Sequence, residues 1–357
     1  MRTPTGDHRW MRVLSGLTAI VLAAGVASVV AMERGTGSPP LETSSESVAP
    51  PLAQPLADGT LRATRPSTTT SQPLPPERDV SAYRGLGAWV DAFDYGPAYH
   101  RPREGPLLVP DDLDDMAARG VGTVFLQAAR LDERSPEGIV DRGLVAAFLA
   151  RAHDNGMQVV GWYLPKFADV EADLANLRLI RDFDVEGHRF DGIAVDIEYR
   201  KDVPDHAERN RRLIDLSRRL REESGGQALG AIVYPPVLLD EIRPGFWPDF
   251  PWTELAESYD VWLPMVYWTE IAREAPLYGD GYGYTEAGIR TLMAHLAGGS
   301  ALIHAVGGVA DTSTVSDFEG FVRAVGEAGA LGFSMYDYRT TSDAGWGLLA
   351  PPAPGSG

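Results

Sequence analysis

The fold of this chain is decided by the stretch Phe190-Asp191-Gly192-Ile193-Ala194-Val195-Asp196-Ile197-Glu198-Tyr199, an apolar run that ends in two acids. Side chains alternate along a strand, so the branched aliphatic residues share one face, and Ala194, Asp196 and Glu198 share the other. Two residues of strand place the two acids roughly 6–7 Å apart. Carboxylates this close, beside an apolar run, repel each other and lose water, which raises the pKa of one of them. The pattern predicts a carboxylic acid that stays protonated near neutral pH.

The composition suits one large folded domain and excludes several classes of chemistry. The chain has 357 residues, 44% of them hydrophobic, which is ample for a sizeable core. It has no cysteine, which excludes disulfides, thiolate metal sites and cysteine nucleophiles. Residues 1–80 contain seven arginines and seven acids, which cancel. Residues 81–357 therefore carry the whole net charge of −18. Nucleic acid and anionic lipid bind clustered Lys and Arg, so we expect neither as a partner of the folded region.

The N-terminus predicts an export signal. Arg2, Arg9 and Arg12 precede an uncharged run of about twenty residues that ends at Met32, just long enough to span a bilayer. We expect residues 1–32 to be an uncleaved signal-anchor, or a signal peptide if the run is cleaved. Basic residues before the run hold that end in the cytoplasm. The rest of the chain is then extracytoplasmic, tethered to the cell membrane or secreted.

Two further segments have the composition of disordered chain. Residues 33–80 are rich in Pro, Ser and Thr and carry too few apolar side chains to form a core. We expect an extended linker there, and a short disordered tail at residues 351–357.

Beyond residue 80, short apolar segments alternate with amphipathic ones. The candidate strands are 84–93, 122–128, 158–164, 192–198, 228–234, 261–267, 301–309 and 332–338. The candidate helices are 111–119, 139–153, 168–183, 206–223, 285–296 and 316–328. The helical pattern is weak at 252–258 and after the last strand. The glycines of 278–284 predict a loop.

Alternating strands and helices require a parallel sheet, and eight repeats favour its closure. The fold class is therefore α/β, a (β/α)8 TIM barrel, with the catalytic domain at residues 81–350. No G-x-G-x-x-G follows the first strand, which counts against a dinucleotide-binding sheet.

In such a barrel, chemistry lies at the C-terminal ends of the strands. The residues at those ends are mainly acids and aromatics: Asp91, Asp94, Gln127, Trp162, Tyr163, Asp196, Glu198, Tyr234, Tyr267, Trp268, Tyr336, Asp337 and Tyr338. Carboxylates stabilise an oxocarbenium-like transition state, and aromatic rings stack on sugar faces. The set predicts sugar chemistry.

The fourth-strand motif resembles that of glycoside hydrolase family 18, the chitinases and endo-β-N-acetylglucosaminidases. The pattern of that family is D-G-x-D-x-D-x-E. Asp191, Gly192, Asp196 and Glu198 match it, and Ala194 replaces an Asp.

Two other strand ends are similar to the same family. Its sixth strand ends M-x-Y-D; here Met265 and Tyr267 match, and Trp268 replaces the Asp. Tyr336 stands where the eighth strand of the family places a Trp under the sugar.

The resemblance implies substrate-assisted hydrolysis with retention. Glu198 would protonate the glycosidic oxygen, and the N-acetyl oxygen of the substrate would attack the anomeric carbon. Asp196 would orient the acetamide, and Tyr267 would hydrogen-bond to it. The substrate-binding candidates are Asp91, Trp162, Tyr234, Met265, Trp268, Tyr336 and Asp337. The expected partner is a glycan that contains N-acetylhexosamine, and we expect no cofactor and a monomeric barrel.

Ala194 keeps other interpretations open, because the acid it replaces shares a proton with its neighbour in the family. The barrel could be an ordinary two-carboxylate glycosidase, with Glu198 paired to Asp91, Asp94 or Asp337. It could also be a cell-surface carbohydrate-binding barrel without turnover. The two acids could also have a purely structural role and form a salt bridge with Arg200 or Lys201 at the end of the strand.

Three further residues have structural interpretations. Asp191 has the opposite parity to Asp196, so we expect it to cap the strand entry. His304 lies within a strand and is expected in the core, and His153 falls on a helix outside the barrel. No H-E-x-x-H or paired His/Asp pattern occurs, so no metal site is expected.

Overall fold

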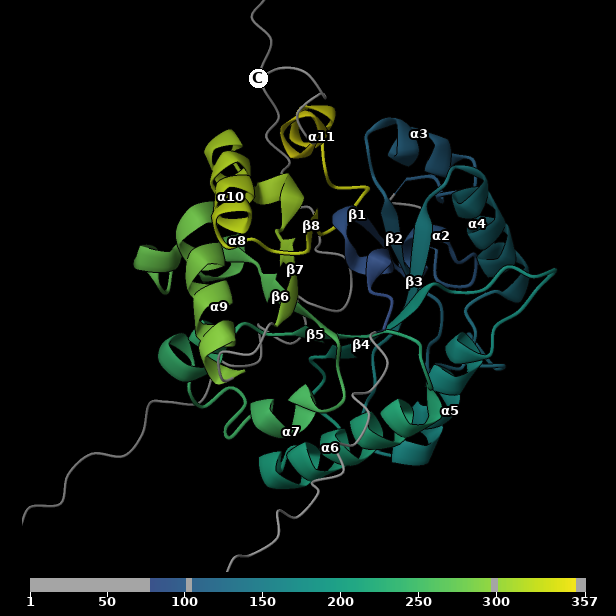
Figure 1. Ribbon diagram of the computed structural model, residues 1–357, viewed down its shortest axis with the longest axis horizontal. Helices are drawn as coiled ribbons and strands as arrows, with labels where there is room; N and C mark the ends of the chain where they lie inside the picture. The colour runs from purple at the N-terminus through teal and green to yellow at the C-terminus, as the bar shows by residue number, and fades with distance from the viewer. Residues whose placement is uncertain (1–77, 101–104, 297–300, 351–357) are drawn as a thin grey trace, which may run out of the picture. The chain divides into compact units, whose positions relative to one another are not determined.

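The computed structural model describes residues 78–100, 105–296 and 301–350, which form a closed barrel of eight parallel strands (Figure 1). Each strand pairs with the next, and β1 pairs with β8 to close the ring. The strands are β1 Gly85–Val90, β2 Thr123–Gln127, β3 Gln158–Tyr163, β4 Gly192–Ile197, β5 Leu229–Val233, β6 Val261–Val266, β7 Leu302–Gly307 and β8 Gly332–Met335. The predicted barrel is confirmed.

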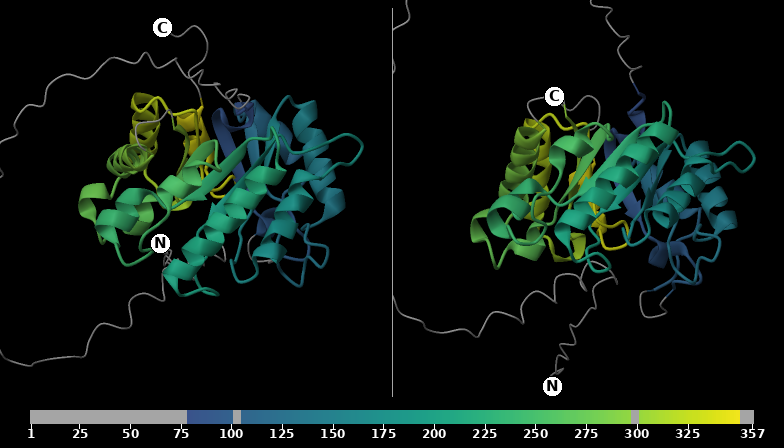
Figure 2. Two further views of the ribbon diagram at one scale, coloured as in Figure 1. Left: turned by 60° about the horizontal axis from the view of Figure 1, so that its bottom comes forward. Right: turned by 90° about the horizontal axis from the view of Figure 1, so that it is seen from below.

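Helices surround the ring of strands, as the views in Figures 1 and 2 show. They are α2 Ala92–Tyr95, α3 Asp112–Ala118, α4 Arg142–Asp154, α5 Val170–Arg181, α6 His206–Glu223, α7 Trp252–Ala256, α8 Trp268–Ile271, α9 Gly281–His295, α10 Val315–Glu327 and α11 Asp343–Leu349. The segment 252–258, where the sequence predicted only a weak helix, forms the short helix α7. Between β5 and α7 the chain also forms a π-helical turn, Leu238–Ile242, which was not predicted.

The segments predicted to anchor and extend the chain, 1–32 and nearly all of 33–80, lie outside the described residues, as does the tail 351–357. None of the helices in the described ranges combines the length and hydropathy needed to cross a bilayer.

Acidic residues in the strand-to-helix loops begin the helices. Asp169 accepts hydrogen bonds from the backbone N–H groups of the first turn of α5, and Asp205 caps α6 in the same way. Thr314 forms a capping box at the start of α10. Such caps satisfy backbone donors that the helix itself leaves free, and they account for part of the excess of acids.

The interior of the barrel is filled by side chains rather than open. The base is closed by Tyr83, from the 3-10 turn Ser81–Tyr83, whose hydroxyl donates to the carbonyl of Ile193 at 2.7 Å. A Cβ on Gly192 would lie 2.8 Å from the Tyr83 hydroxyl oxygen. The glycine of the fourth-strand motif is therefore required by the packing of Tyr83.

The helix α9 corrects one sequence prediction. Residues 278–284 were expected to form a loop, but α9 begins at Gly281, because Asp280 accepts from the N–H groups of Tyr282 and Gly283 at 2.9 and 2.7 Å. A Cβ on Gly281 would lie 2.0 Å from the carbonyl oxygen of Asp317. Gly281 is therefore needed because α9 and α10 pack closely at this point, and not because the segment is a mobile loop.

The C-terminal helix α11 was not predicted. Its seven residues include three that are buried, Gly345, Trp346 and Leu349. Ser342 caps it by accepting from the N–H of Gly345 at 3.2 Å. The segment is too short to show helical periodicity, and its helix depends on packing.

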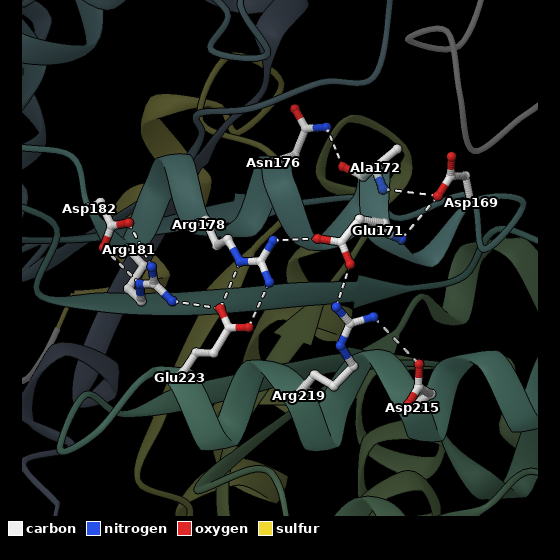
Figure 3. A network of polar contacts seen from close by, with 10 residues as sticks. All are labelled: Asp169, Glu171, Ala172, Asn176, Arg178, Arg181, Asp182, Asp215, Arg219 and Glu223. Carbon is white, nitrogen blue, oxygen red and sulfur yellow. Dashed lines mark hydrogen bonds and ion pairs between the residues drawn. The ribbon is translucent and has the colours of Figure 1, made fainter.

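The helices α5 and α6 are joined by the ion-pair network in Figure 3. Glu223 accepts from Arg178 at 2.7 Å and from Arg181 at 2.8 Å. Glu171 pairs with Arg219. These ion pairs connect the outer faces of α5 and α6.

Candidate active site

The strand β4 delivers both acids of the motif to the C-terminal end of the barrel. Ala194 packs in the core inside the ring. Because side chains alternate along a strand, Asp196 and Glu198 point to the same side as Ala194, toward the inside of the barrel. Each acid is only 7% exposed. Asp191, with the opposite parity, lies at the other end of β4, where it accepts from the N–H of Val159 at 2.7 Å.

The two acids share one buried environment. Burial raises the pKa of Glu198 to about 7, against the opposing effects of a Tyr234 hydrogen bond and of Arg200. Burial also raises the pKa of Asp196 well above its ordinary value, and the neighbouring Glu198 raises it further. Since two adjacent buried carboxylates resist ionising together, the pair retains a proton near neutral pH.

One oxygen of this pair has no hydrogen-bond partner in the described part of the chain. It is Asp196 Oδ1, which is buried. A buried acceptor without a partner is costly, so a donor supplied by a ligand would find a favourable position there.

The salt-bridge interpretation of the acids is wrong for Arg200. Its guanidinium lies 3.5 Å from the ring centroid of Phe246 and donates to the carbonyl oxygen of that residue at 2.8 Å. Within the described ranges, neither Asp196 nor Glu198 forms an ion pair. The positive charge of Arg200 lowers the pKa of Glu198 without an ion pair between the two side chains.

A second group of buried acids lies just after β1 and β8. Asp91 and Asp94 are each 6% exposed, and Asp337 is 2% exposed. Burial, with the nearby charge of Asp91, raises the pKa of Asp337 to about 6. Burial, then Asp91 and Asp337, raise the pKa of Asp94 well above its ordinary value. The three acids that sequence analysis considered as partners for Glu198 therefore form their own coupled cluster.

Two tyrosines lie between the acid groups. The Tyr336 hydroxyl donates to Asp91 Oδ2 at 3.1 Å, and the rings of Tyr336 and Tyr267 have centroids 5.9 Å apart. Burial raises the pKa of Tyr267, and the charges of Glu198 and Asp196 raise it further. Tyr267 is therefore close enough to both acids for their charges to shift its pKa. It lies next to Tyr336, which follows β8.

The floor beneath these residues is aromatic. Trp89 stacks on Phe125 with centroids 4.5 Å apart and an interplanar angle of 12°. Trp162 donates its indole N–H to the carbonyl of Phe125 at 3.2 Å, and Met265 belongs to the same core. Trp162 and Met265 therefore form the packed floor, and Tyr234, which hydrogen-bonds to Glu198, forms part of the wall.

Trp268 does not join this group. It is 1% exposed, and its ring lies 5.5 Å from that of Phe321 on α10. The side chain therefore packs between β6 and the helix layer. Trp268 is the first residue of α8 rather than part of a strand, so we leave it out of the proposed substrate-binding set.

Sequence reasoning missed a polar chain under the site. Trp89 donates its indole N–H to Ser334 Oγ at 2.7 Å, Ser334 lies 2.9 Å from His304 Nε2, and His304 Nδ1 lies 2.8 Å from the carbonyl of Tyr83. Because a carbonyl only accepts, His304 carries its proton on Nδ1 and accepts from Ser334. His304 is thus a satisfied core residue, as expected.

Gln127, named above only as a strand-end residue, and Arg130, which was not predicted, also support the site. Gln127 Oε1 accepts from the N–H of Ala92 at 3.0 Å and from Arg130 at 2.9 Å. Arg130 opposes the rise in the pKa of Asp91. The signal available in the sequence was the position of Gln127 at the end of a strand.

Comparison with solved structures places this fold. The C-terminal domain of a putative chitinase from Desulfitobacterium hafniense aligns with a TM-score of 0.51 at 13% identity, over 75% of this chain and 98% of that one. A class V chitinase from Pseudomonas fluorescens gives 0.51 at 11% identity, over 74% and 98%. A plant class V chitinase mutant from Cycas revoluta, in complex with (GlcNAc)3, gives 0.52 at 13%, over 74% and 98%.

The chain folds as a barrel like that of the family 18 chitinases. At these identities the likeness concerns the fold. No protein-family model and no curated protein sequence matches the chain. The chemistry of the family 18-like barrel must therefore be argued from its own residues.

Proposed function

We propose that this barrel is a retaining glycoside hydrolase that acts on N-acetylhexosamine-containing glycans, with Glu198 as its acid and base. The observation that carries the proposal is the buried acid pair at the C-terminal end of β4, in which the pKa of Glu198 is raised to about 7. A general acid is most effective when its pKa lies near the working pH.

In the proposed reaction, protonated Glu198 donates its proton to the glycosidic oxygen as the C–O bond breaks. The acetamide oxygen of the substrate forms a bond to the anomeric carbon from the opposite face. Asp196 Oδ1, which lacks a partner, accepts the acetamide N–H and stabilises the developing positive charge. Water then attacks the anomeric carbon as its bond to the acetamide oxygen breaks, and Glu198 takes the proton of the water. The two displacements together give retention.

Five further side chains are proposed to hold the substrate. Tyr267, which lies close to both acids, would donate to the acetamide oxygen. The rings of Tyr336 and Trp89, 6.4 Å apart, would support the sugar face. Asp91 and Asp337 would accept from sugar hydroxyls.

The test is the hydrolysis of a glycan panel by the purified barrel: chitin oligomers, N-glycan cores and cell-wall glycan. Glu198→Gln keeps the size of the side chain and removes the proton, so reducing-sugar release should fall by about 10²–10⁴-fold, with binding retained. Turnover that persists in this variant would reject Glu198 as the acid. The anomer of the first product distinguishes retention from inversion.

Ala194 favours a second candidate, a carbohydrate-binding barrel without turnover. Among the described residues, Glu198 is then the one charged group that shifts the pKa of Asp196. The proton relay is reduced from three acids to two. Glycan binding with no turnover in either the parent protein or Glu198→Gln would support this candidate.

We propose that the barrel works outside the cytoplasm, tethered by residues 1–32. The support is the basic, then apolar pattern of that segment. Fractionation of cells that express the full chain tests it: the protein should sediment with membranes, and added protease should reach the barrel in intact cells without an outer membrane, or in spheroplasts.

A further inference from the structure

A group of titratable side chains at the opposite end of the barrel is not used by the proposed hydrolysis. His153 lies in the last turn of α4, His188 ends a tight turn with a bridge to Val185, and Asp191 immediately precedes β4. The Nδ1 atoms of the two histidines are 3.3 Å apart. His153 Nε2 lies 3.1 Å from Asp191 Oδ2.

The carboxylate fixes the tautomer of His153. Asp191 Oδ2 accepts from the N–H of Val159 at 2.7 Å, which holds the acid in place, and it accepts the Nε2–H of His153. The lone pair of neutral His153 is therefore on Nδ1, the atom that faces His188. An acid that holds the far N–H of an imidazole in this way orients metal-binding histidines and increases their basicity.

We propose that His153 and His188 bind one borderline divalent cation, such as Zn²⁺, through their Nδ1 atoms. Zn–N bonds of about 2.0–2.1 Å at a tetrahedral angle place two ligand nitrogens roughly 3.3–3.4 Å apart, and the observed separation is 3.3 Å. Without the cation, His188 donates its Nδ1–H to His153. With it, His188 adopts the neutral tautomer that is protonated on Nε2.

The site is open rather than closed. No group of three potential ligand side chains occurs in the described ranges, and the His153 side chain is 28% exposed. Water completes the coordination of the cation. The site is therefore of the exchangeable kind rather than a permanent structural centre.

The charges around the pair favour a cation. Two acids lie beside His153: Asp191, 3.1 Å from its Nε2 atom, and Asp154, the next residue along the chain. The nearest arginine along the chain, Arg189, is paired with Asp184. The C-terminal end of α4 adds the negative end of its dipole. A bound cation would link the end of α4 to the segment before β4 and stabilise the base of the barrel.

Thermal unfolding of the full chain, with any histidine tag removed, tests the site. At 100 times the dissociation constant, ZnCl₂ should raise Tm by about 5 °C, and calorimetric titration should give one site per chain. MgCl₂, a hard cation that prefers oxygen ligands, should have no effect. Because the chain lacks cysteine, zinc has no thiolates to bind in the unfolded state.

Matched variants locate the effect. His188→Gln should abolish the zinc response, and Asp191→Asn should weaken zinc binding by about 10–100-fold. His295→Gln should leave it unchanged, since His295 is also paired with an acid, Asp240 at 2.6 Å, but faces no second histidine. The proposal is overturned if zinc leaves Tm of the parent protein unchanged, or if His188→Gln keeps the full response.

Discussion

The hydroxyl of Tyr336, which follows β8, donates to the carboxylate of Asp91, which follows β1, at 3.1 Å. The contact joins residues 245 positions apart, across the seam where the barrel closes. It holds the Tyr336 ring beside Tyr267, and so it links the acid cluster of β1 and β8 to the acid pair of β4.

Substitutions of Tyr336 separate the hydroxyl from the ring. Tyr336→Phe should lower the free energy of unfolding by about 0.5–1.5 kcal/mol, because Asp91 loses a hydrogen bond, but it should keep glycan affinity within about twofold. Tyr336→Ala removes the platform and should weaken binding by about tenfold. Calorimetric titration with a chitin oligomer measures both variants. Equal losses of affinity would show that the hydroxyl, not the ring, binds the sugar.

Tyr234 tunes the acid. Its hydrogen bond lowers the pKa of Glu198 against the larger effect of burial, so Tyr234→Phe should raise that pKa. Glu198 must be protonated to act, so kcat/KM should fall as the pH rises through about 7 in the parent protein. In Tyr234→Phe this alkaline limb should move to higher pH.

The control for Tyr234→Phe is Tyr199→Phe, which removes a hydroxyl next to Glu198 in sequence that donates to Asp202 at 2.9 Å instead. It should leave the pH profile in place. An alkaline limb that stays fixed in Tyr234→Phe would contradict the role of Tyr234.

His304 should make stability depend on pH. Burial lowers the pKa of His304 to about 4, against an ordinary value of 6.5. The unfolded chain therefore binds a proton first as the pH falls, and stability is lost between about pH 6.5 and 4. The loss from this group is roughly 3 kcal/mol.

Urea unfolding of the parent protein and His304→Gln, at pH 7 and pH 4.5, measures this effect as the difference between the two proteins. The variant should be less stable at pH 7 but should lose less stability on acidification. His206→Gln, at an exposed helix start, is the control and should follow the parent protein. Parallel pH curves for the parent and His304→Gln would refute the assignment.

The ion-pair network of α5 and α6 should respond to salt. Glu223 contacts both Arg178 and Arg181, so Glu223→Gln should lower the free energy of unfolding by about 0.5–1 kcal/mol at low ionic strength. The difference should shrink in 1 M NaCl, where the Debye length is about 3 Å. Chemical denaturation at both salt concentrations checks it. Glu222→Gln, on the same helix but with a single contact, to Arg218, should have the smaller effect.

Sequence alone predicted the elements with strong periodicity. All eight strands lie within the predicted ranges, since buried parallel strands are continuous apolar runs that glycines bound. The prediction was weakest where helices are short or begin in glycine. For α9, the Asp280 cap outweighs the glycines, and for α11, burial of Trp346 stabilises a helix that its own sequence does not.

The candidate site divides in the same way. The sequence alone placed Asp196 and Glu198 on the same face as Ala194, because alternation is a local property of a strand. The packing of Ala194 in the core shows that this face is the inner one. The sequence could not show that Trp268 packs under α10, or that Ser334 and His304 support Trp89. These contacts join strands that are distant in the chain.

What the sequence determined by itself was therefore the strand order, the shared face of the acid pair and the kinds of side chain at the strand ends. Only the tertiary structure decided which acids share a proton, which stand in the separate cluster of β1 and β8, and which aromatic rings form the floor. Charge interactions and burial depend on distance through space, and closing the barrel brings β1 against β8, a neighbourhood that no local pattern records.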